Sequence, residues 1–179
     1  QDGIPKPSNE FVGEADLPNI SSGYQLLNGK TIEVKTDKYN LNISEIGGDI
    51  RKLTLSDHLA DNYVDDYVLF SDASDPVLDS LLYVAQSGLL GKNLPSHKSK
   101  FIFEKNSYTL NGETLSVPMI FNSPEVSVKK TYQFSEDSYL INVRYDIQNK
   151  TQSTIAPRAY FQLIHDGDSN QGTKLTPSF

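Results

Sequence analysis

The chain has 179 residues, of which 37% are hydrophobic and 22% charged, and its formal net charge is -7. This length suits one domain, which can bury roughly 70% of its unfolded surface. The acidic balance argues against nucleic acid, whose phosphates need patches of Lys and Arg, and against docking on an anionic lipid surface. Because the chain has no cysteine, disulfides, thiolate metal sites and a cysteine nucleophile are excluded.

The first part of the chain, residues 1 to about 23, contains three prolines, three glycines and no regular alternation, which is typical of a linker. The chain starts at Gln1 without an initiator methionine and stops at Phe179 without terminal character, so we expect a piece of a longer polypeptide. No window approaches the run of about 18 apolar residues that a membrane span needs. Any membrane anchor is therefore expected outside the chain.

The first regular pattern follows a short apolar stretch, Tyr24–Leu27, which is compatible with a strand entering a type I′ turn at Asn28-Gly29. From Ile32 to Leu55, apolar and polar residues then alternate in two runs. A period of two indicates β-strands, because successive side chains point to opposite faces. The sequence Gly47-Gly48-Asp49 interrupts the pattern, and paired glycines permit the positive φ of a chain reversal. We predict a β-meander with a glycine corner and no chemistry on its face.

Acidic and polar residues replace the alternation from Ser56 to Asp66, where we predict a loop. Such a block usually only hydrates, so we interpret it as a solvated loop or sheet edge. The stretch Asp66–Ser71 has the length and apolar content of a strand, whereas Val77–Leu82 fits one helical turn or a strand equally well. The aspartates that crowd this region are Asp57, Asp61, Asp65, Asp66, Asp72, Asp75 and Asp79.

The second half of the chain shows further strand patterns. Phe101 and Phe103 share one face of a short predicted strand. The pair Asn111-Gly112 lies between the apolar stretches Tyr108–Leu110 and Leu115–Val117, which is the clearest hairpin signal in the chain.

Two longer strands are predicted next, Val126–Phe134 and Tyr139–Ile147, with a turn at 135–137. We expect them to pair antiparallel, with one face toward a second sheet and the other toward water. Strands and turns at this spacing indicate an all-β sandwich or barrel. One face of the first strand carries Val126, Val128, Lys130, Tyr132 and Phe134.

Six segments in this order resemble the large periplasmic domain of the YidC/Oxa/Alb family of membrane protein insertases. The most specific parts are the Thr36-Asp37 pair, the Gly47-Gly48-Asp49 corner and the AQSGL run within Tyr83–Gly91. The resemblance implies an antiparallel β-supersandwich similar to galactose mutarotases, incomplete at the C-terminus. The segments are GKTIEVKTDKYNLNISEIGGDI (29–50), YVAQSGLLG (83–91), TLNGETLSVPMIF (109–121), VKKTYQF (128–134), YLINVRYDIQN (139–149) and YFQLIHD (160–166).

The resemblance also implies a location and a role. It makes residues 1–23 a linker after a transmembrane helix and 24–179 the larger, N-terminal part of a periplasmic domain of the bacterial inner membrane. Further strands and then membrane spans would follow Phe179. The domain would be a non-catalytic scaffold that meets SecDF beside SecYEG and nascent membrane proteins. In the family, insertion is attributed to transmembrane helices around an arginine; Arg51, Arg144 and Arg158 are instead expected on strands or loops.

The candidates for catalytic or metal-binding side chains are few. The three histidines, His58, His97 and His165, have no metal-ligand spacing, and we expect loop or surface positions. The pair His165-Asp166 would be an acid–base pair only if it faced a pocket. The alternation of Asp166, Asp168 and Asn170 resembles a calcium loop, yet Gln171 stands where an EF-hand needs glycine, so a turn is the simpler interpretation.

Other catalytic motifs are incomplete. Gln86-Ser87-Gly88 lacks the preceding glycine of a serine hydrolase elbow, and Gly47-Gly48 lacks the Lys-Ser/Thr of a phosphate loop. We therefore predict no catalytic, cofactor or metal residue, no enzyme activity and no cofactor, and we assign no partner-binding residue. Two alternatives remain open. One is a carbohydrate-binding or sugar-isomerising β-sandwich, suggested by fold analogy; the other is a peptide-binding module that uses an exposed strand edge or a groove between the sheets.

Overall fold

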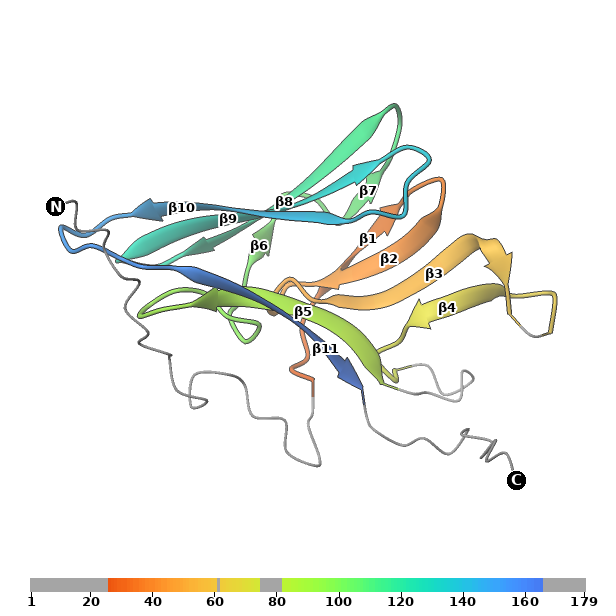
Figure 1. Cartoon of the computed structure of the whole chain (residues 1–179), viewed down its shortest axis with the longest axis horizontal. Helices are drawn as coiled ribbons and strands as arrows, with labels where there is room; N and C mark the ends of the chain where they lie inside the picture. The colour runs from red at the N-terminus through yellow and green to blue at the C-terminus, as the bar shows by residue number, and fades with distance from the viewer. Residues whose placement is uncertain (1–25, 61, 75–81, 166–179) are drawn as a thin grey trace, which may run out of the picture.

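The computed structural model describes residues 26–60, 62–74 and 82–165, which form two β-sheets packed face to face (Figure 1). All the secondary structure of these residues is β, so the predicted all-β sandwich is confirmed. The strands are β1 (Thr31–Lys35), β2 (Tyr39–Ser44), β3 (Ile50–Leu59), β4 (Asp66–Phe70), β5 (Tyr83–Leu90), β6 (Ile102–Phe103), β7 (Ser107–Thr109), β8 (Thr114–Asn122), β9 (Val126–Ser135), β10 (Asn142–Asn149) and β11 (Arg158–His165).

The larger sheet has the strand order β11-β5-β3-β2-β1-β7, with β4 paired to β3 outside this path, and the smaller has the order β10-β9-β8-β6. Every pairing between named strands is antiparallel except that of β1 with β7, which is parallel. The prediction of an antiparallel sandwich therefore holds apart from this one pair. The expected linker over 1–23, the strand residues Tyr24 and Gln25, and most of Val77–Leu82 lie outside the described residues.

The meander predicted between Ile32 and Leu55 is confirmed as β1, β2 and β3. Its alternation places Ile32 and Val34 in the interior, while the alternate residues Thr31, Glu33 and Lys35 face solvent. Burying an apolar side chain of this size stabilises the fold by roughly 1.5–3 kcal/mol. The main core lies between the two sheets, where the meander meets Val117 and Met119 of β8 and Phe134 of β9.

The predicted pairing of the two long strands is confirmed. β9 and β10 pair antiparallel in an unbroken register from Asn142 opposite Gln133 to Asn149 opposite Val126. The predicted face of β9, Lys130 included, points into the protein. The second strand begins at Asn142 rather than Tyr139, so Tyr139 and Leu140 remain in the connecting segment.

The hairpin predicted around Asn111-Gly112 is wrong. β7 pairs with β1 in the larger sheet, whereas β8 pairs with β6 and β9 in the smaller sheet. The Asn-Gly segment therefore carries the chain from one sheet to the other. Both flanking strands prefer to bury a face against the core, with Tyr108 on one side and Val117 on the other, and this long-range packing overrides the local turn signal.

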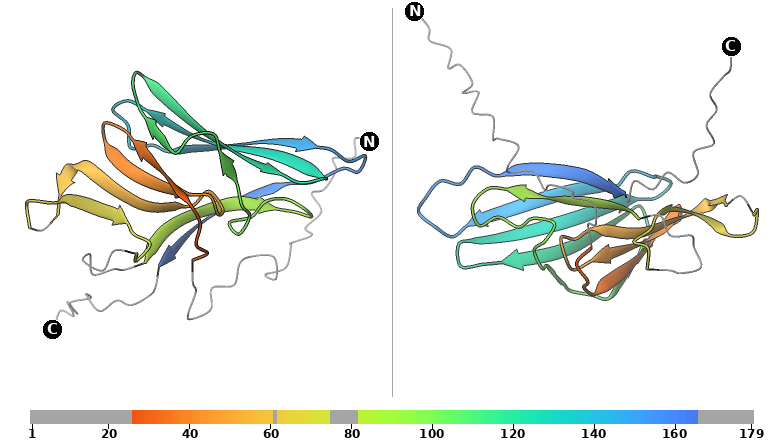
Figure 2. Two further views of the ribbon diagram at one scale, coloured as in Figure 1. Left: turned by 180° about the vertical axis from the view of Figure 1, so that it is seen from behind. Right: turned by 90° about the horizontal axis from the view of Figure 1, so that it is seen from below.

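Two other boundaries differ from the prediction. β3 continues to Leu59, where a loop was expected, because it gains a second partner: Leu55 lies opposite Tyr67 and Leu59 opposite Asp66. The predicted strand at Asp66–Ser71 is confirmed as β4. Residues 26–30 form no strand, and the predicted type I′ turn at Asn28-Gly29 is wrong, because Gly29 is not among the glycines with positive φ. The β3–β4 hairpin projects at one end of the molecule, beyond the smaller sheet (Figure 2).

Candidate functional site

The glycine corner between β2 and β3 lies at the centre of a buried polar cluster. Gly47 and Gly48 have φ of 72° and 64°, so the predicted positive φ is confirmed. In this conformation both carbonyls accept hydrogen bonds from Lys130 Nζ, at 2.8 Å and 3.1 Å. The Tyr132 hydroxyl donates to the Gly48 carbonyl at 2.6 Å. Two side chains of β9 therefore fix a corner of the opposite sheet.

Lys130 is fully buried, which is uncommon for lysine. Besides the two glycine carbonyls, its Nζ lies 3.5 Å from the Ser87 carbonyl of β5, so three acceptors surround an ammonium with three hydrogens. The ring of Tyr132 lies 5.1 Å from Nζ and that of Tyr145 5.7 Å, which adds cation–π attraction. Burial nevertheless lowers the pKa of Lys130 to about 7, against the opposing effect of Asp49.

Asp49 follows the glycine corner and is also fully buried. Its Oδ2 accepts a hydrogen bond from Gln86 Nε2 at 2.6 Å and one from Arg51 Nη2 at 3.2 Å. Gln86 is held in turn by Gln162, whose Nε2 donates to its Oε1 at 2.8 Å. Burial raises the pKa of Asp49 to about 6, although Arg51, Gln86 and Lys130 oppose this. The cluster therefore joins strands β3, β5 and β11 with β9.

The buried cluster is suited to holding the fold together and not to turning over a substrate. Lys130 and Asp49 have no exposed surface. The ammonium of Lys130 donates its hydrogen bonds to backbone carbonyls, which are fixed parts of the chain. A nucleophilic or general-base lysine has to reach its substrate. The sequence pattern predicted no chemistry on this face and did not reveal the cluster. A signal was nevertheless present, because Lys130 occupies an otherwise apolar face of its strand.

The three histidines lie on separate parts of the fold and contact different partners. His97 is buried in a loop, where its backbone N–H donates to the Tyr160 hydroxyl at 2.9 Å and its Nδ1 lies 2.6 Å from the same oxygen. Burial lowers the pKa of His97, which favours the neutral form of the ring. His58 contacts the Tyr139 hydroxyl, and His165 ends β11. The expected loop or surface positions hold, except that the loop histidine, His97, is buried.

The other described side chains that the sequence suggested as candidates lie within strands. Ser87 lies within β5, and its Oγ is 3.0 Å from the Tyr145 hydroxyl, so it is not on a strand-to-helix elbow. Arg51, Arg144 and Arg158 lie on β3, β10 and β11, as expected for strands. Across the described residues, His, Asp and Glu form no group that could hold a metal ion. Asp166, Asp168 and Asn170 lie outside the described residues.

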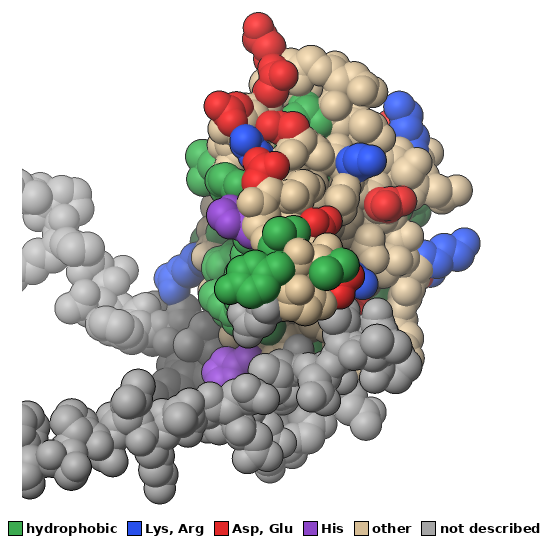
Figure 3. Space-filling model, turned by 90° about the vertical axis from the view of Figure 1, so that its right-hand side faces the viewer, with side chains coloured by type: hydrophobic (Ala, Val, Ile, Leu, Met, Phe, Trp, Pro, Cys, Tyr) green, Lys and Arg blue, Asp and Glu red, His purple; other side chains and the backbone are tan. Residues whose placement is uncertain are grey.

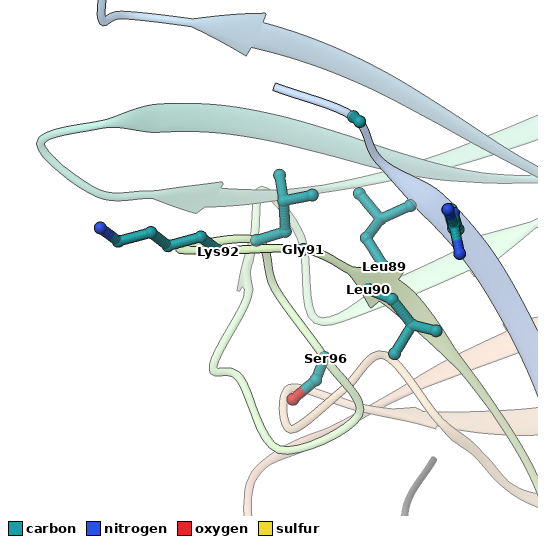
Figure 4. Close-up of a pocket in the computed structure, with 8 residues that line it drawn as sticks. Leu89, Leu90, Gly91, Lys92 and Ser96 are labelled. Atoms are coloured by element: carbon teal, nitrogen blue, oxygen red, sulfur yellow. The ribbon is translucent and has the colours of Figure 1, made fainter. Parts of the chain in front are cut away.

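A hollow of about 580 Å³ lies between the end of β5, the following loop and the start of β11 (Figure 4). Leu89, Leu90 and Leu94 supply apolar walls, and Ser96 and Arg158 supply polar groups. Figure 4 shows the Lys92 side chain directed away from Ser96, so the polar groups do not converge on one point. Ligand sites need convergent polar groups in an apolar pocket, and this hollow lacks them.

Large hydrophobic side chains are exposed at the projecting end of the molecule (Figure 3). They lie on the β3–β4 hairpin and on the neighbouring segment between β9 and β10. We call this surface the hairpin patch; it comprises Leu59, Tyr63, Val64, Tyr67, Leu69, Tyr139 and Leu140. The predicted solvated acidic edge is confirmed for Asp57, Asp65 and Asp66, which are exposed beside the patch, whereas Asp72 is half-buried. The remaining aspartates of this block lie outside the described residues: Asp61, Asp75 and Asp79. None of the described residues forms a helix that could cross a bilayer.

Comparison with known proteins shows which family this chain is similar to. A family model described as the YidC periplasmic domain matches residues 31–179. A protein named Membrane protein insertase YidC from Methylobacillus flagellatus is 38% identical over 97% of this chain, which covers 31% of that relative. Proteins of the same name from Nitrosomonas europaea and Laribacter hongkongensis are 34% and 37% identical over 99% and 96% of this chain. The chain spans only 31% and 30% of their lengths. The resemblance carried by the motifs between Gly29 and Asp166 is confirmed.

Proposed function

The chain belongs to the YidC periplasmic domain family, and from this membership we propose that it is a non-catalytic scaffold within a bacterial inner-membrane protein insertase. In this proposal the domain lies in the periplasm and is attached to the membrane through segments outside this chain. It supports the insertion and folding of membrane proteins by meeting other components. The observation that carries the proposal is the family match over residues 31–179, together with relatives named membrane protein insertases.

The interior of the domain supports a scaffold role. The buried lysine and aspartate are held by partners within the chain, and His97 is held by Tyr160. An enzyme of the sugar-isomerising type would instead need an acid and a base that face a cavity. A rigid sandwich that offers surfaces suits a domain that positions partners. We propose the SecDF complex and SecYEG as those partners, as the family resemblance implies.

The test uses the full-length insertase that contains this chain, produced in cells depleted of their own insertase. Deleting the region equivalent to 31–165 should leave membrane protein insertion detectable, because the domain does not catalyse it. The deletion should also reduce the amount of Sec components that co-purify. A full-length protein with the surface change Ile102→Ser serves as the control. Unchanged co-purification after the deletion, or complete loss of insertion with Sec contact retained, would contradict the scaffold.

A second assay addresses the sugar-directed alternative. The purified chain should not accelerate the interconversion of aldose anomers, and a chelator should leave its melting temperature unchanged. Saturable mutarotation that is lost on His165→Ala would overturn the scaffold proposal in favour of an enzyme.

A further inference from the structure

Most of the exposed large hydrophobic side chains of the described residues lie at one end of the molecule. Eleven large hydrophobic side chains among the described residues are at least 39% exposed, and seven of them form the hairpin patch. The two parts of the patch are joined, since the Tyr139 hydroxyl lies 3.2 Å from His58 Nε2 on β3 and the two rings are 5.9 Å apart. A gathered apolar surface of this kind commonly marks an interaction site.

The turn between β3 and β4 presents two of these side chains in a fixed position. Tyr63 is 83% exposed and Val64 79%. Asn62 Oδ1 accepts hydrogen bonds from the backbone N–H groups of Val64 and Asp65, both at 3.0 Å, and the Ala60 N–H donates to the Asp65 carbonyl at 2.7 Å. Tyr63 adopts a φ of 56°, a conformation that costs a non-glycine residue energy. The turn thus holds the ring of Tyr63 outward at a cost in backbone conformational energy, and the ring contributes nothing to the core.

The exposed charge beside the patch is mainly negative. No Lys or Arg occurs between Lys52 and Lys92 in the sequence, whereas Asp57, Asp65 and Asp66 are exposed beside the apolar side chains. Lys38 lies at the same end, but its Nζ already pairs with Asp57 at 3.2 Å and Asp137 at 2.8 Å. The patch therefore combines apolar surface with carboxylates that attract a cationic partner.

The apolar side chains and the carboxylates of the hairpin patch distinguish among the molecules that could bind it. An anionic lipid surface would be repelled by the carboxylates. A second copy of the chain would bring two patches of the same negative charge together. We propose that the hairpin patch binds a polypeptide segment that carries both basic and large apolar side chains. This deepens the proposed scaffold function, on which it rests for the biological source of the segment, by naming the chemistry of a partner.

The binding test uses the full 179-residue chain and fluorescein-labelled peptides of about twelve residues, measured by fluorescence anisotropy. One peptide alternates Lys and Leu, a second alternates Glu and Leu, and a third alternates Lys and Ser. The patch variants are Tyr63→Ser with Val64→Ser, and Asp65→Asn with Asp66→Asn. The control is Ile102→Ser, because Ile102 is 64% exposed but lies on β6, outside the patch.

The Lys–Leu peptide should bind the unmodified chain and the control equally. Each patch variant should bind it roughly tenfold more weakly, since an exposed aromatic anchor and paired charges dominate such contacts. Circular dichroism establishes that the variants are folded. Absence of binding by the Lys–Leu peptide, equal binding of the Lys–Ser or Glu–Leu peptide, or equal affinity of the patch variants would overturn the proposal.

Two further measurements separate the other occupants. Co-sedimentation with phosphatidylglycerol vesicles that depends on Tyr63 and Val64 would assign the patch to lipid. Concentration-dependent dimerisation lost in the same variant would assign it to a second copy. Either result would overturn the proposal. A failure of the peptide assay leaves the co-purification test of the scaffold untouched, so the two failures are distinguishable.

Discussion

The glycine corner and the hairpin patch depart from ordinary hydropathy in opposite directions. At the corner, Lys130 and Asp49 are charged groups with no exposed surface, whereas on the patch Tyr63 and Val64 are hydrophobic groups that lie almost entirely in water. Both arrangements cost free energy in isolation, because buried charges lose hydration and exposed apolar groups order water.

The difference lies in where the compensation is found. The corner is largely compensated within the chain, because backbone carbonyls surround the ammonium and Gln86 and Arg51 hold Oδ2 of the Asp49 carboxylate. Asp49 Oδ1 is buried without a hydrogen-bond partner among the described residues. The patch has no comparable compensation, since its side chains contact solvent. Buried charged groups that are mostly satisfied by their own chain indicate a structural role, whereas exposed hydrophobic groups indicate a role that involves another molecule.

The largest expected effect comes from filling the corner. In Gly48→Val, a side chain would be forced onto positive φ and would collide with Met119 Sδ while lying 3.1 Å from Lys130 Nζ. We expect a loss of roughly 3–5 kcal/mol in the free energy of unfolding, from strain and overpacking together. Urea denaturation measures it. The control is Gly112→Val, because Gly112 also has a positive φ, 111°, but a Cβ added there would meet no atom within 4 Å. Equal losses in both variants would mean that packing at the corner contributes nothing.

Removing the buried ammonium tests the pH dependence of the corner. The pKa of Lys130 is lowered to about 7 in the folded protein, so the unfolded chain binds more protons above that pH. The free energy of unfolding should therefore rise between pH 7 and pH 9.5, on the order of 2 kcal/mol. In Lys130→Met this rise should disappear, whereas Lys129→Met, an exposed change on the same strand, should retain it. Parallel pH profiles for all three proteins would refute this origin of the rise.

Removing the hydroxyl of Tyr160 tests whether its buried contact with His97 also stabilises the fold. In Tyr160→Phe, the backbone N–H and the Nδ1 of His97 lose the oxygen that lies 2.9 Å and 2.6 Å away. We expect a loss of about 1–2 kcal/mol in the free energy of unfolding, as for other buried groups left without a partner. Thermal denaturation measures it, with the exposed Tyr67→Phe as the matched control. If both variants melt together, the His97 contact is not stabilising.

The smallest effect on stability is expected at the patch. Tyr63→Ser combined with Val64→Ser should change the free energy of unfolding by less than about 0.5 kcal/mol, because neither side chain packs on the core. Leu53→Ala on the same hairpin removes a buried side chain and should cost about 2–4 kcal/mol. Urea denaturation of both variants makes the comparison. A large loss in the patch variant would show that these side chains support the fold, and the contrast with the corner would disappear.

The parts of the fold predicted from the sequence are those governed by periodicity. Alternation located β1 to β3 and the β9–β10 pair, and two adjacent glycines located the positive φ. The Asn111-Gly112 hairpin failed because a turn signal is local, whereas the partner of β7 is a strand more than 70 positions earlier in the chain. Which strands pair is decided by burial in the whole sandwich.

The candidate sites were predicted less well, for a related reason. The cluster requires Gly47 and Lys130 to meet across 83 positions, and no sequence spacing expresses that contact. The hairpin patch was hidden by composition, because Tyr63 and Val64 lie among aspartates in a stretch interpreted as hydrated loop. Only the extension of β3 to Leu59 and its pairing with β4 reveal that these residues lie in the turn of a β-hairpin.

The contact between Lys130 and the glycine corner also has a consequence for folding kinetics, because it joins two distant parts of the chain. The meander of β1 to β3 closes short loops, whereas Lys130 must cross 83 positions to reach Gly47 and lose its hydration on arrival. Long loops carry the greater entropic cost of closure, so we expect the meander to form before the Lys130 contact. Interactions made after the rate-limiting barrier slow unfolding without speeding folding. We therefore expect Lys130→Met to change the rate of unfolding more than the rate of folding, which stopped-flow denaturation measures.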